Sequence, residues 1–163
     1  MTQRIIDTPR LRLVLDSTEL ALSRIAAMSP EDQAQVSPEW IARLQAASPT
    51  PWTHSFSMHE RASDIVVGMC AFKGGVDADG AVEIAYGVDE KYRGRGYAKE
   101  AARALTEFAF TAGAKTVRAH TLREQSPSTG VLSACGFQFV GEVVDPEDGP
   151  VWRWEQVAAP LDT

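Results

Sequence analysis

The apolar and polar positions of this chain switch repeatedly between the period of strands and the period of helices. Alternation over residues 11–15, just after a proline, predicts a first strand. Apolar residues at helical spacing then predict two short helices, one ending before Pro30 and one beginning near Ser37. Two segments rich in β-favouring residues, 53–61 and 64–73, predict a hairpin.

The alternation is most regular over residues 81–88. One face of this expected strand carries bulky apolar side chains, whereas the other carries small residues and a single carboxylate, that of Glu83. Gly87 lies late in the strand, where a bulge or the close approach of another backbone is expected. A helical period follows over 97–113, and residues 116–121 predict a further strand. The order strand, helix, strand predicts a crossover connection and a parallel pair of strands.

The last part of the chain predicts one more helix and one more hairpin. Ser126 is a suitable N-cap, Pro127 suits the first helical position and Gly136 suits the end of the helix. Residues 137–144 and 151–157 predict two strands, joined by a turn rich in Asp, Pro and Gly.

The composition is that of an ordinary globular protein, with 44% hydrophobic and 23% charged residues. Its length of 163 residues predicts a single domain over 1–163. A formal net charge of −6 argues against a general nucleic-acid binder. Neither a secretion signal nor an apolar stretch of membrane-spanning length is found, so we expect a cytoplasmic protein without a membrane partner. Cys70 and Cys135 are expected to be buried free thiols.

A basic turn with two glycines joins the 81–88 strand to the 97–113 helix. It comprises Arg93, Gly94, Arg95, Gly96, Tyr97, Ala98 and Lys99. Glycines let a backbone turn tightly, and the first turn of a helix leaves its amides unpaired, so the turn favours binding of a pyrophosphate. Lys99 occupies the position of the third small residue in a dinucleotide fingerprint, and no Walker A pattern is present. A protein that binds ATP or NAD nevertheless stays open as an alternative.

The turn and its surroundings resemble the GNAT superfamily of N-acetyltransferases. The segment 93–98 is similar to the signature of that superfamily, which is arginine or glutamine, two residues, glycine, one residue, then glycine or alanine. Cys135-Gly136-Phe137 resembles the Gly-Phe pair at the start of the last hairpin. The opening segment 8–13 is similar to the branch that includes the bacterial ribosomal-protein alanine acetyltransferases.

This resemblance implies an α/β (α+β) fold with a mixed, splayed central sheet of about seven strands flanked by about four helices. It also implies that acetyl-CoA is wedged where two central strands diverge, with no metal required. The turn residues 93–99 would hold the pyrophosphate, and the backbone around Val88 would pair with the pantetheine arm and polarise the thioester. Gln125 aligns with the asparagine of the Asn-x-x-Ser pattern found in the ribosomal-protein branch and is expected to contact the cofactor.

Glu83 and Ser128 are the expected catalytic residues. Free alkyl amines have pKa values of about 10, so transfer of an acetyl group to an amine benefits from a base, and Glu83 lies on the small-residue face beside the expected cofactor. Many members of the superfamily donate a proton to the departing thiolate from a tyrosine, but Leu132 occupies that position here. Ser128, which aligns with the serine of the Asn-x-x-Ser pattern, is the expected substitute.

The expected activity is direct transfer of an acetyl group from acetyl-CoA to a primary amine within a ternary complex. The acceptor is an amine-bearing small molecule or a protein N-terminus, and a homodimer is a further possibility. Asp145, Glu147 and Asp148 form an acidic turn that would attract a cationic acceptor. Because the usual tyrosine is missing, a non-catalytic acyl-CoA-binding sensor or regulatory module of the same fold remains the alternative.

Overall fold

The computed structural model describes residues 4–46, 48–146 and 149–158. Within this part of the chain, eight strands form one sheet in the order β1-β2-β3-β4-β5-β6-β8-β7. The strands are β1 (Ile5–Asp7), β2 (Leu11–Leu15), β3 (Phe56–Glu60), β4 (Val66–Phe72), β5 (Ala81–Val88), β6 (Thr116–Thr121), β7 (Gln138–Asp145) and β8 (Gly149–Val157). The helices are α1 (Thr18–Ala27), α2 (Pro30–Gln35), α3 (Pro38–Ala46), α4 (Tyr97–Thr111) and α5 (Pro127–Ala134), with a short 3₁₀ helix, η1 (Glu90–Tyr92).

The sheet is mixed and opens at its centre, as predicted. β5 and β6 form the parallel pair, and they are paired only over Ala81–Glu83 of β5 and Thr116–Arg118 of β6. β5 continues to Val88 while paired with β4 on its other side. The described neighbours are otherwise antiparallel. Beyond Glu83 the two central strands therefore diverge.

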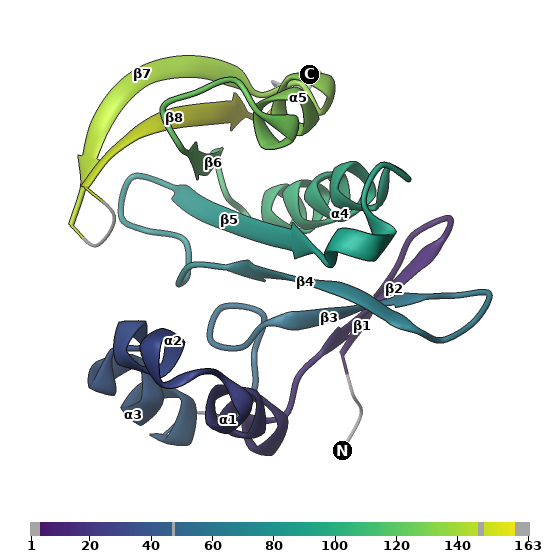
Figure 1. Cartoon of the computed structure of the whole chain (residues 1–163). Helices are drawn as coiled ribbons and strands as arrows, with labels where there is room; N and C mark the ends of the chain where they lie inside the picture. The colour runs from purple at the N-terminus through teal and green to yellow at the C-terminus, as the bar shows by residue number, and fades with distance from the viewer. Residues whose placement is uncertain (1–3, 47, 147–148, 159–163) are drawn as a thin grey trace.

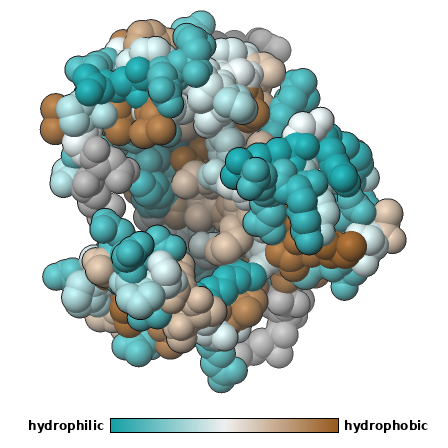
Figure 2. All heavy atoms as spheres, viewed as in Figure 1, coloured by the Kyte–Doolittle hydropathy of each residue, from teal (hydrophilic) through white to brown (hydrophobic). Residues whose placement is uncertain are grey.

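Two groups of helices lie apart from each other around this sheet. Figure 1 shows α4 running along β5 and α5 lying beside β7 and β8, whereas α1, α2 and α3 gather below β3 and β4. The hydrophobic core lies between α4 and the strands, and small alanines on α4 allow close packing against Leu11, Leu13 and Ile84. The space-filling view shows a hollow between the β7–β8 hairpin above and α1–α3 below (Figure 2).

The structure adds one strand and one helix to the sequence-based expectation of about seven strands and four helices. β1 is a three-residue edge strand paired with β2, too short to show a periodic pattern. α2 has the sequence PEDQAQ and buries none of its residues, so it carries no apolar stripe. Its capping signal was nevertheless present, because Ser29 caps the helix and Pro30 begins it.

Other local expectations were confirmed with small changes. Gly136 ends α5 with φ 90°, and the 53–73 hairpin forms from the shorter strands β3 and β4. The pairing of β5 with β4 shows no register shift at Gly87; instead, a Cβ atom on Gly68 would lie 2.3 Å from the carbonyl oxygen of Gly87. Gly68 therefore permits the close backbone approach.

Both cysteines are free thiols, and Cys70 is buried as expected. Cys135 is only partly buried, which corrects the expectation for this residue. Its Sγ donates to the carbonyl oxygen of Lys99 at 3.5 Å, where the end of α5 meets α4. Among the described residues, no helix has the length and apolar character needed to cross a membrane.

Candidate active site

The basic turn adopts a conformation that its glycines make possible. Gly94 and Gly96 have φ angles of 80° and 84°, in the left-handed region that favours glycine. α4 begins directly after Gly96, and no side chain caps this end of the helix. The first amides of α4 are therefore open to a ligand, and an anion is the ligand that they favour.

Contacts from three elements fix the turn in place. Arg93 Nε donates to the carbonyl oxygen of Val88 at 2.9 Å, which ties the turn to the end of β5. The Tyr97 hydroxyl donates to Glu60 of β3, and this hydrogen bond raises the pKa of Tyr97 and lowers that of Glu60. Glu100 accepts from Arg10 Nε at 3.0 Å, joining α4 to the β1–β2 turn. The amides at the start of α4 are thus presented by a braced backbone.

Beyond its pairing with β6, β5 directs backbone groups into the opening between the two strands. The carbonyl oxygen of Glu83 accepts from the amide of Lys73, the residue directly after β4, at 2.8 Å, and the amide of Asp89 donates to the carbonyl oxygen of Val67 of β4 at 2.8 Å. Backbone groups alternate in direction along a strand. The amides of residues 86 and 88 therefore point away from β4, toward the side where β6 has diverged. An extended, amide-bearing chain could pair with them there.

A cavity of about 120 Å³ lies at this divergence. It is lined by the residue directly after β4 and by residues of β5, β6 and α5, namely Lys73, Glu83, Ile84, Ala85, Tyr86, Ala119, His120 and Ser128. The cavity thus brings together the two expected catalytic residues, Glu83 and Ser128, from different elements.

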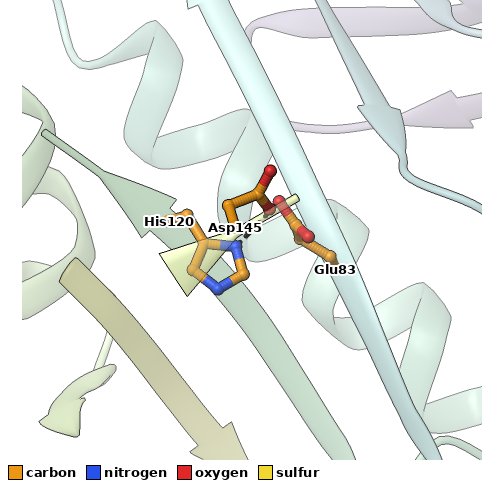
Figure 3. Close-up of side chains that lie close together, drawn as sticks. All are labelled: Glu83, His120 and Asp145. Atoms are coloured by element: carbon orange, nitrogen blue, oxygen red, sulfur yellow. Dashed lines mark ion pairs between the residues drawn. The ribbon is translucent and has the colours of Figure 1, made fainter. Parts of the chain in front are cut away.

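The Glu83 carboxylate is part of a partly buried ionic cluster. His120 Nδ1 lies 3.0 Å from Glu83 Oε2, and Lys73 Nζ lies 3.5 Å from the same oxygen. Figure 3 shows Glu83, His120 and Asp145 directed toward one another from β5, β6 and the end of β7. The side chain of His120 is 10% exposed and that of Glu83 is 21% exposed, so both remain reachable from the cavity.

The hydrogen bonds of His120 determine which ring nitrogen carries the proton. Arg153 Nε donates to His120 Nε2 at 3.1 Å, and an arginine can only donate. The neutral ring therefore carries its proton on Nδ1, facing Glu83. This approach is oblique: Nδ1 is buried and makes no aligned hydrogen bond, although its distance to Oε2 is that of an ion pair. His120 thus presents a proton beside the carboxylate.

Glu83, His120 and Asp145 also have the composition of a metal site, since one ligand atom from each lies within 4.8 Å of the others. The chemistry of this set does not favour a cation. Nδ1 binds a metal only through a free lone pair, whereas the bond from Arg153 leaves the proton of the neutral ring on that nitrogen. Lys73 also places a positive charge beside Glu83. The cluster therefore lacks the free imidazole lone pair that would hold a metal beside Glu83.

Ser128 lies in the first turn of α5 and contacts a tyrosine of β5. Ser126 caps this helix through a capping box with Thr129, which fixes the position of Ser128 at its second residue. The Tyr86 hydroxyl lies 3.2 Å from Ser128 Oγ. Burial raises the pKa of Tyr86, and the hydrogen bond with Ser128 offsets part of this rise.

Two other residues expected near the cofactor have different surroundings. Leu132 is fully buried in the hydrophobic core and does not line the cavity. Gln125 is exposed before α5, where its Oε1 accepts from Thr129 Oγ1 at 3.2 Å. In this structure Gln125 supports the start of α5, and its expected contact with a cofactor stays a prediction.

A larger cavity of about 630 Å³ lies elsewhere, between the β1–β2 turn and the length of α4 from Gly96 to Thr111. It shares only Gly96 and Lys99 with the expected cofactor residues, and it contains neither Glu83 nor Ser128. If volume were the only criterion, this larger cavity would be the candidate active site. We place the chemistry in the smaller cavity, because that is where a carboxylate, an imidazole and two hydroxyls converge.

The comparison with known families agrees with this geometry. The family model described as "Acetyltransferase (GNAT) domain" matches residues 6–138, which include the turn, β5 and α5. The chain belongs to the GNAT acetyltransferase family. The predicted family and the predicted splayed fold are therefore confirmed.

One curated relative of this GNAT protein matches part of the chain. "Uncharacterized N-acetyltransferase p20" from Bacillus licheniformis is 31% identical over 93 residues, which cover 56% of this chain and 52% of the relative. The chain thus spans about half the length of this curated relative.

Solved structures of other GNAT proteins match nearly the whole chain. One is a putative ribosomal-protein-serine acetyltransferase from Vibrio cholerae, with 21% identity, a TM-score of 0.67 and coverage of 95% of this chain and 98% of the other. Another is RimL, a ribosomal-protein acetyltransferase in complex with coenzyme A, with 16% identity, a TM-score of 0.71 and coverage of 94% and 98%. At these identities the likeness shows the fold alone.

Within the GNAT fold, the structure brings the predicted residues to two neighbouring places. The residues 93–99 form the turn before α4, and Val88 ends the strand that leads to it. Glu83 and Ser128 meet at the cavity between β5 and β6. Their roles in binding and catalysis remain predictions, which the arrangement supports.

Sequence reasoning missed His120 and Tyr86. The three histidines show no metal-ligand spacing, so none stood out. His120 meets Glu83 because the parallel register places Glu83 opposite Arg118, two residues before His120 on β6. The alternation of β6 could have indicated that Arg118 and His120 share a face. No signal in the sequence shows that the Tyr86 hydroxyl reaches α5.

Proposed function

We propose that this chain is an N-acetyltransferase that moves an acetyl group from acetyl-CoA to a primary amine by direct transfer in a ternary complex. One observation carries the proposal: a carboxylate on β5 and a hydroxyl on α5, those of Glu83 and Ser128, line one cavity at the divergence of the central strands. Acyl transfer to an amine needs a base for the amine and a donor for the leaving group. The cavity offers both.

The chain has the groups needed to hold coenzyme A. The first amides of α4 and the charges of Arg95 and Lys99 would receive the pyrophosphate. A Cβ atom built on Gly94 meets nothing within 4 Å, so the surface of the turn is open to an approaching phosphate. The unpaired side of β5 offers backbone groups for the pantetheine arm. When bound, acetyl-CoA supplies an activated acyl group on a sulfur leaving group.

Glu83 would accept the proton that the acceptor amine must lose before it attacks. His120 Nδ1 lies 3.0 Å from this carboxylate and would help to hold it in place, and the bond that Arg153 donates to Nε2 keeps the proton of the neutral ring on Nδ1. The amide of Val88 points into the opening and would stabilise negative charge on the carbonyl oxygen of the thioester as the amine adds. Ser128 would then donate a hydrogen bond to the departing sulfur.

A protein N-terminus is a suitable acceptor for this site. An α-amino group has a pKa of about 8, roughly two units below that of a lysine side chain, so a carboxylate base deprotonates it more easily. A solved structure of the same fold, from Salmonella typhimurium, is described as modifying the N-terminal serine of a 50S ribosomal subunit protein. Amine-bearing small molecules remain the other acceptor class.

The proposal is tested by the release of free thiol from acetyl-CoA in the presence of peptides with free N-termini and of small amines. We expect release that depends on both acetyl-CoA and an amine. Binding of coenzyme A without release on any amine would contradict transferase activity and identify an acyl-CoA-binding module. Stabilisation by ATP or NAD that exceeds stabilisation by coenzyme A would contradict the assignment of the turn itself.

A further inference from the structure

Ser128 alone is an incomplete donor for a departing thiolate. A serine hydroxyl has a single proton and rotates freely, so its direction depends on what its oxygen accepts. If the hydroxyl is to point its proton at a sulfur atom in the cavity, another group has to occupy its acceptor side. The amides at the start of α5 favour negative charge nearby, but they do not orient the hydroxyl.

Tyr86 is the group placed to do this. Its side chain extends from β5 to the first turn of α5, where its hydroxyl lies 3.2 Å from Ser128 Oγ, a contact in which either oxygen can be the donor. The same hydroxyl can also donate to the Ser128 carbonyl oxygen at 3.4 Å, and the shorter contact is the one that can orient the Ser128 hydroxyl. Both residues line the cavity that contains Glu83. Because burial raises the pKa of Tyr86, the phenol stays protonated at neutral pH and is available as a donor.

Leu132 of α5 offers no alternative donor. Leu132 is 0% exposed and packs in the core, one helical turn after Ser128. Tyr86, which extends from β5 to α5, supplies the phenol hydroxyl that Leu132 lacks.

We propose that Tyr86 is a positioning residue that donates its hydroxyl proton to Ser128 Oγ and thereby directs the Ser128 proton to the sulfur of coenzyme A. This inference rests on the proposed function, since it assumes that the thioester binds between β5 and α5. Tyr86 itself touches Ser128 and not the reacting atoms.

The chemistry balances without a further reactant. The acceptor ammonium gives one proton to Glu83, and the amine nitrogen forms a bond to the thioester carbon. When the C–S bond breaks, its electron pair goes to the sulfur, which the Ser128 hydroxyl stabilises. The nitrogen loses its second proton, and one proton ends on the sulfur as the free thiol. The net release is one proton to solvent.

The test measures the ionisation of the coenzyme A thiol when it is bound, through the ultraviolet absorbance of its thiolate as the pH rises. This readout needs no acceptor. A free alkyl thiol has a pKa of about 8.5, and hydrogen bonds to the thiolate lower it. The proteins compared are the wild type, Tyr86→Phe, Ser128→Ala and the double variant. Tyr92→Phe is the matched control, because Tyr92 lies in η1 and its contacts with Lys91 and Arg95 use the ring, which phenylalanine keeps.

We expect the wild type and Tyr92→Phe to lower the thiol pKa equally, and Tyr86→Phe to raise it again by about one unit. Because Tyr86 acts through Ser128, the double variant should match Ser128→Ala. Additive effects of the two substitutions would overturn the proposal, as would an unchanged thiol pKa in Tyr86→Phe.

Failure of this inference is distinguishable from failure of the proposed function. Suppose that coenzyme A binds with a lowered thiol pKa that depends on Tyr86 and Ser128, while no amine is acetylated. The positioning of Ser128 by Tyr86 is then supported, and the transferase assignment is contradicted. If amines are acetylated but the thiol pKa is the same in Tyr86→Phe as in the wild type, only the positioning role of Tyr86 is contradicted. Absence of any coenzyme A binding would overturn both.

Discussion

The turn before α4 makes the sharpest prediction about cofactor binding, through the substitution Gly96→Ala. Gly96 has φ 84° and is the N-cap of α4, where its backbone directs the first amides outward. An alanine in the left-handed region costs about 1–2 kcal/mol. The added Cβ would lie 3.1 Å from Arg10 Nη2, which is the end of a flexible side chain and can move aside. The main effect is therefore conformational strain.

The strain translates into a loss of affinity if the free variant relaxes its turn. Binding of coenzyme A must then restore the strained backbone. A strain of roughly 1–2 kcal/mol raises the dissociation constant about 5- to 30-fold. Isothermal titration of coenzyme A measures this directly.

The matched control is Gly113→Ala. Gly113 follows the other end of α4 with φ 106°, and a Cβ atom there meets nothing within 4 Å. This variant should show a comparable loss in its free energy of unfolding but an unchanged dissociation constant. Equal affinity in Gly96→Ala and the wild type, with the free energy of unfolding of Gly96→Ala also unchanged, would refute the assignment of the turn as the pyrophosphate site, because a relaxed turn would then bind coenzyme A as well as the original one.

Four further predictions concern the core and the cavity. Replacing Glu83 by Gln should slow acetyl transfer about 10²-fold or more near neutral pH and less as the pH approaches the pKa of the amine; parallel rate–pH profiles would contradict a role as base. Leu132→Tyr should lower the free energy of unfolding by about 1–3 kcal/mol in urea melts, because it overpacks a fully buried position, and should not speed transfer. Burial lowers the pKa of His54 from 6.5, so the unfolded state binds the proton more tightly; stability should fall as the pH drops below 6.5, and the pH dependence should flatten in His54→Gln. In alkylation followed by mass spectrometry, Cys135 should react before Cys70, because Cys70 is only 2% exposed and burial raises the pKa of its thiol; equal rates in the folded protein would show that Cys70 is accessible.

The parts of the fold that sequence predicts are those whose pattern is local. β5 alternates over eight residues and α4 carries its apolar stripe over 15, so each could be located from its own periodicity. The two glycines of the turn have the positive φ that a tight turn before a helix requires. α2 shows the opposite case: it buries nothing, so only its cap and proline mark it.

The parts of the site that sequence did not predict depend on contacts between distant segments. Glu83 and His120 are 37 positions apart, and their contact depends on the register of a parallel pair that is only three residues long. Tyr86 stands on the expected apolar face of β5, where its ring predicts packing and its hydroxyl is easily overlooked. Its partner Ser128 is set by the cap at Ser126, 40 residues after Tyr86. Such pairings become visible only when the strands and α5 are placed in space.

The most direct test of the account is transfer of an isotopically labelled acetyl group from acetyl-CoA into a mixture of peptides and metabolites, followed by mass spectrometry. The account predicts labelled amide on one class of amine, with one free thiol released per acetyl group transferred and with the rate reduced in Glu83→Gln. Thiol release with the label ending in water as acetate, or no labelled amine despite bound acetyl-CoA, would contradict it.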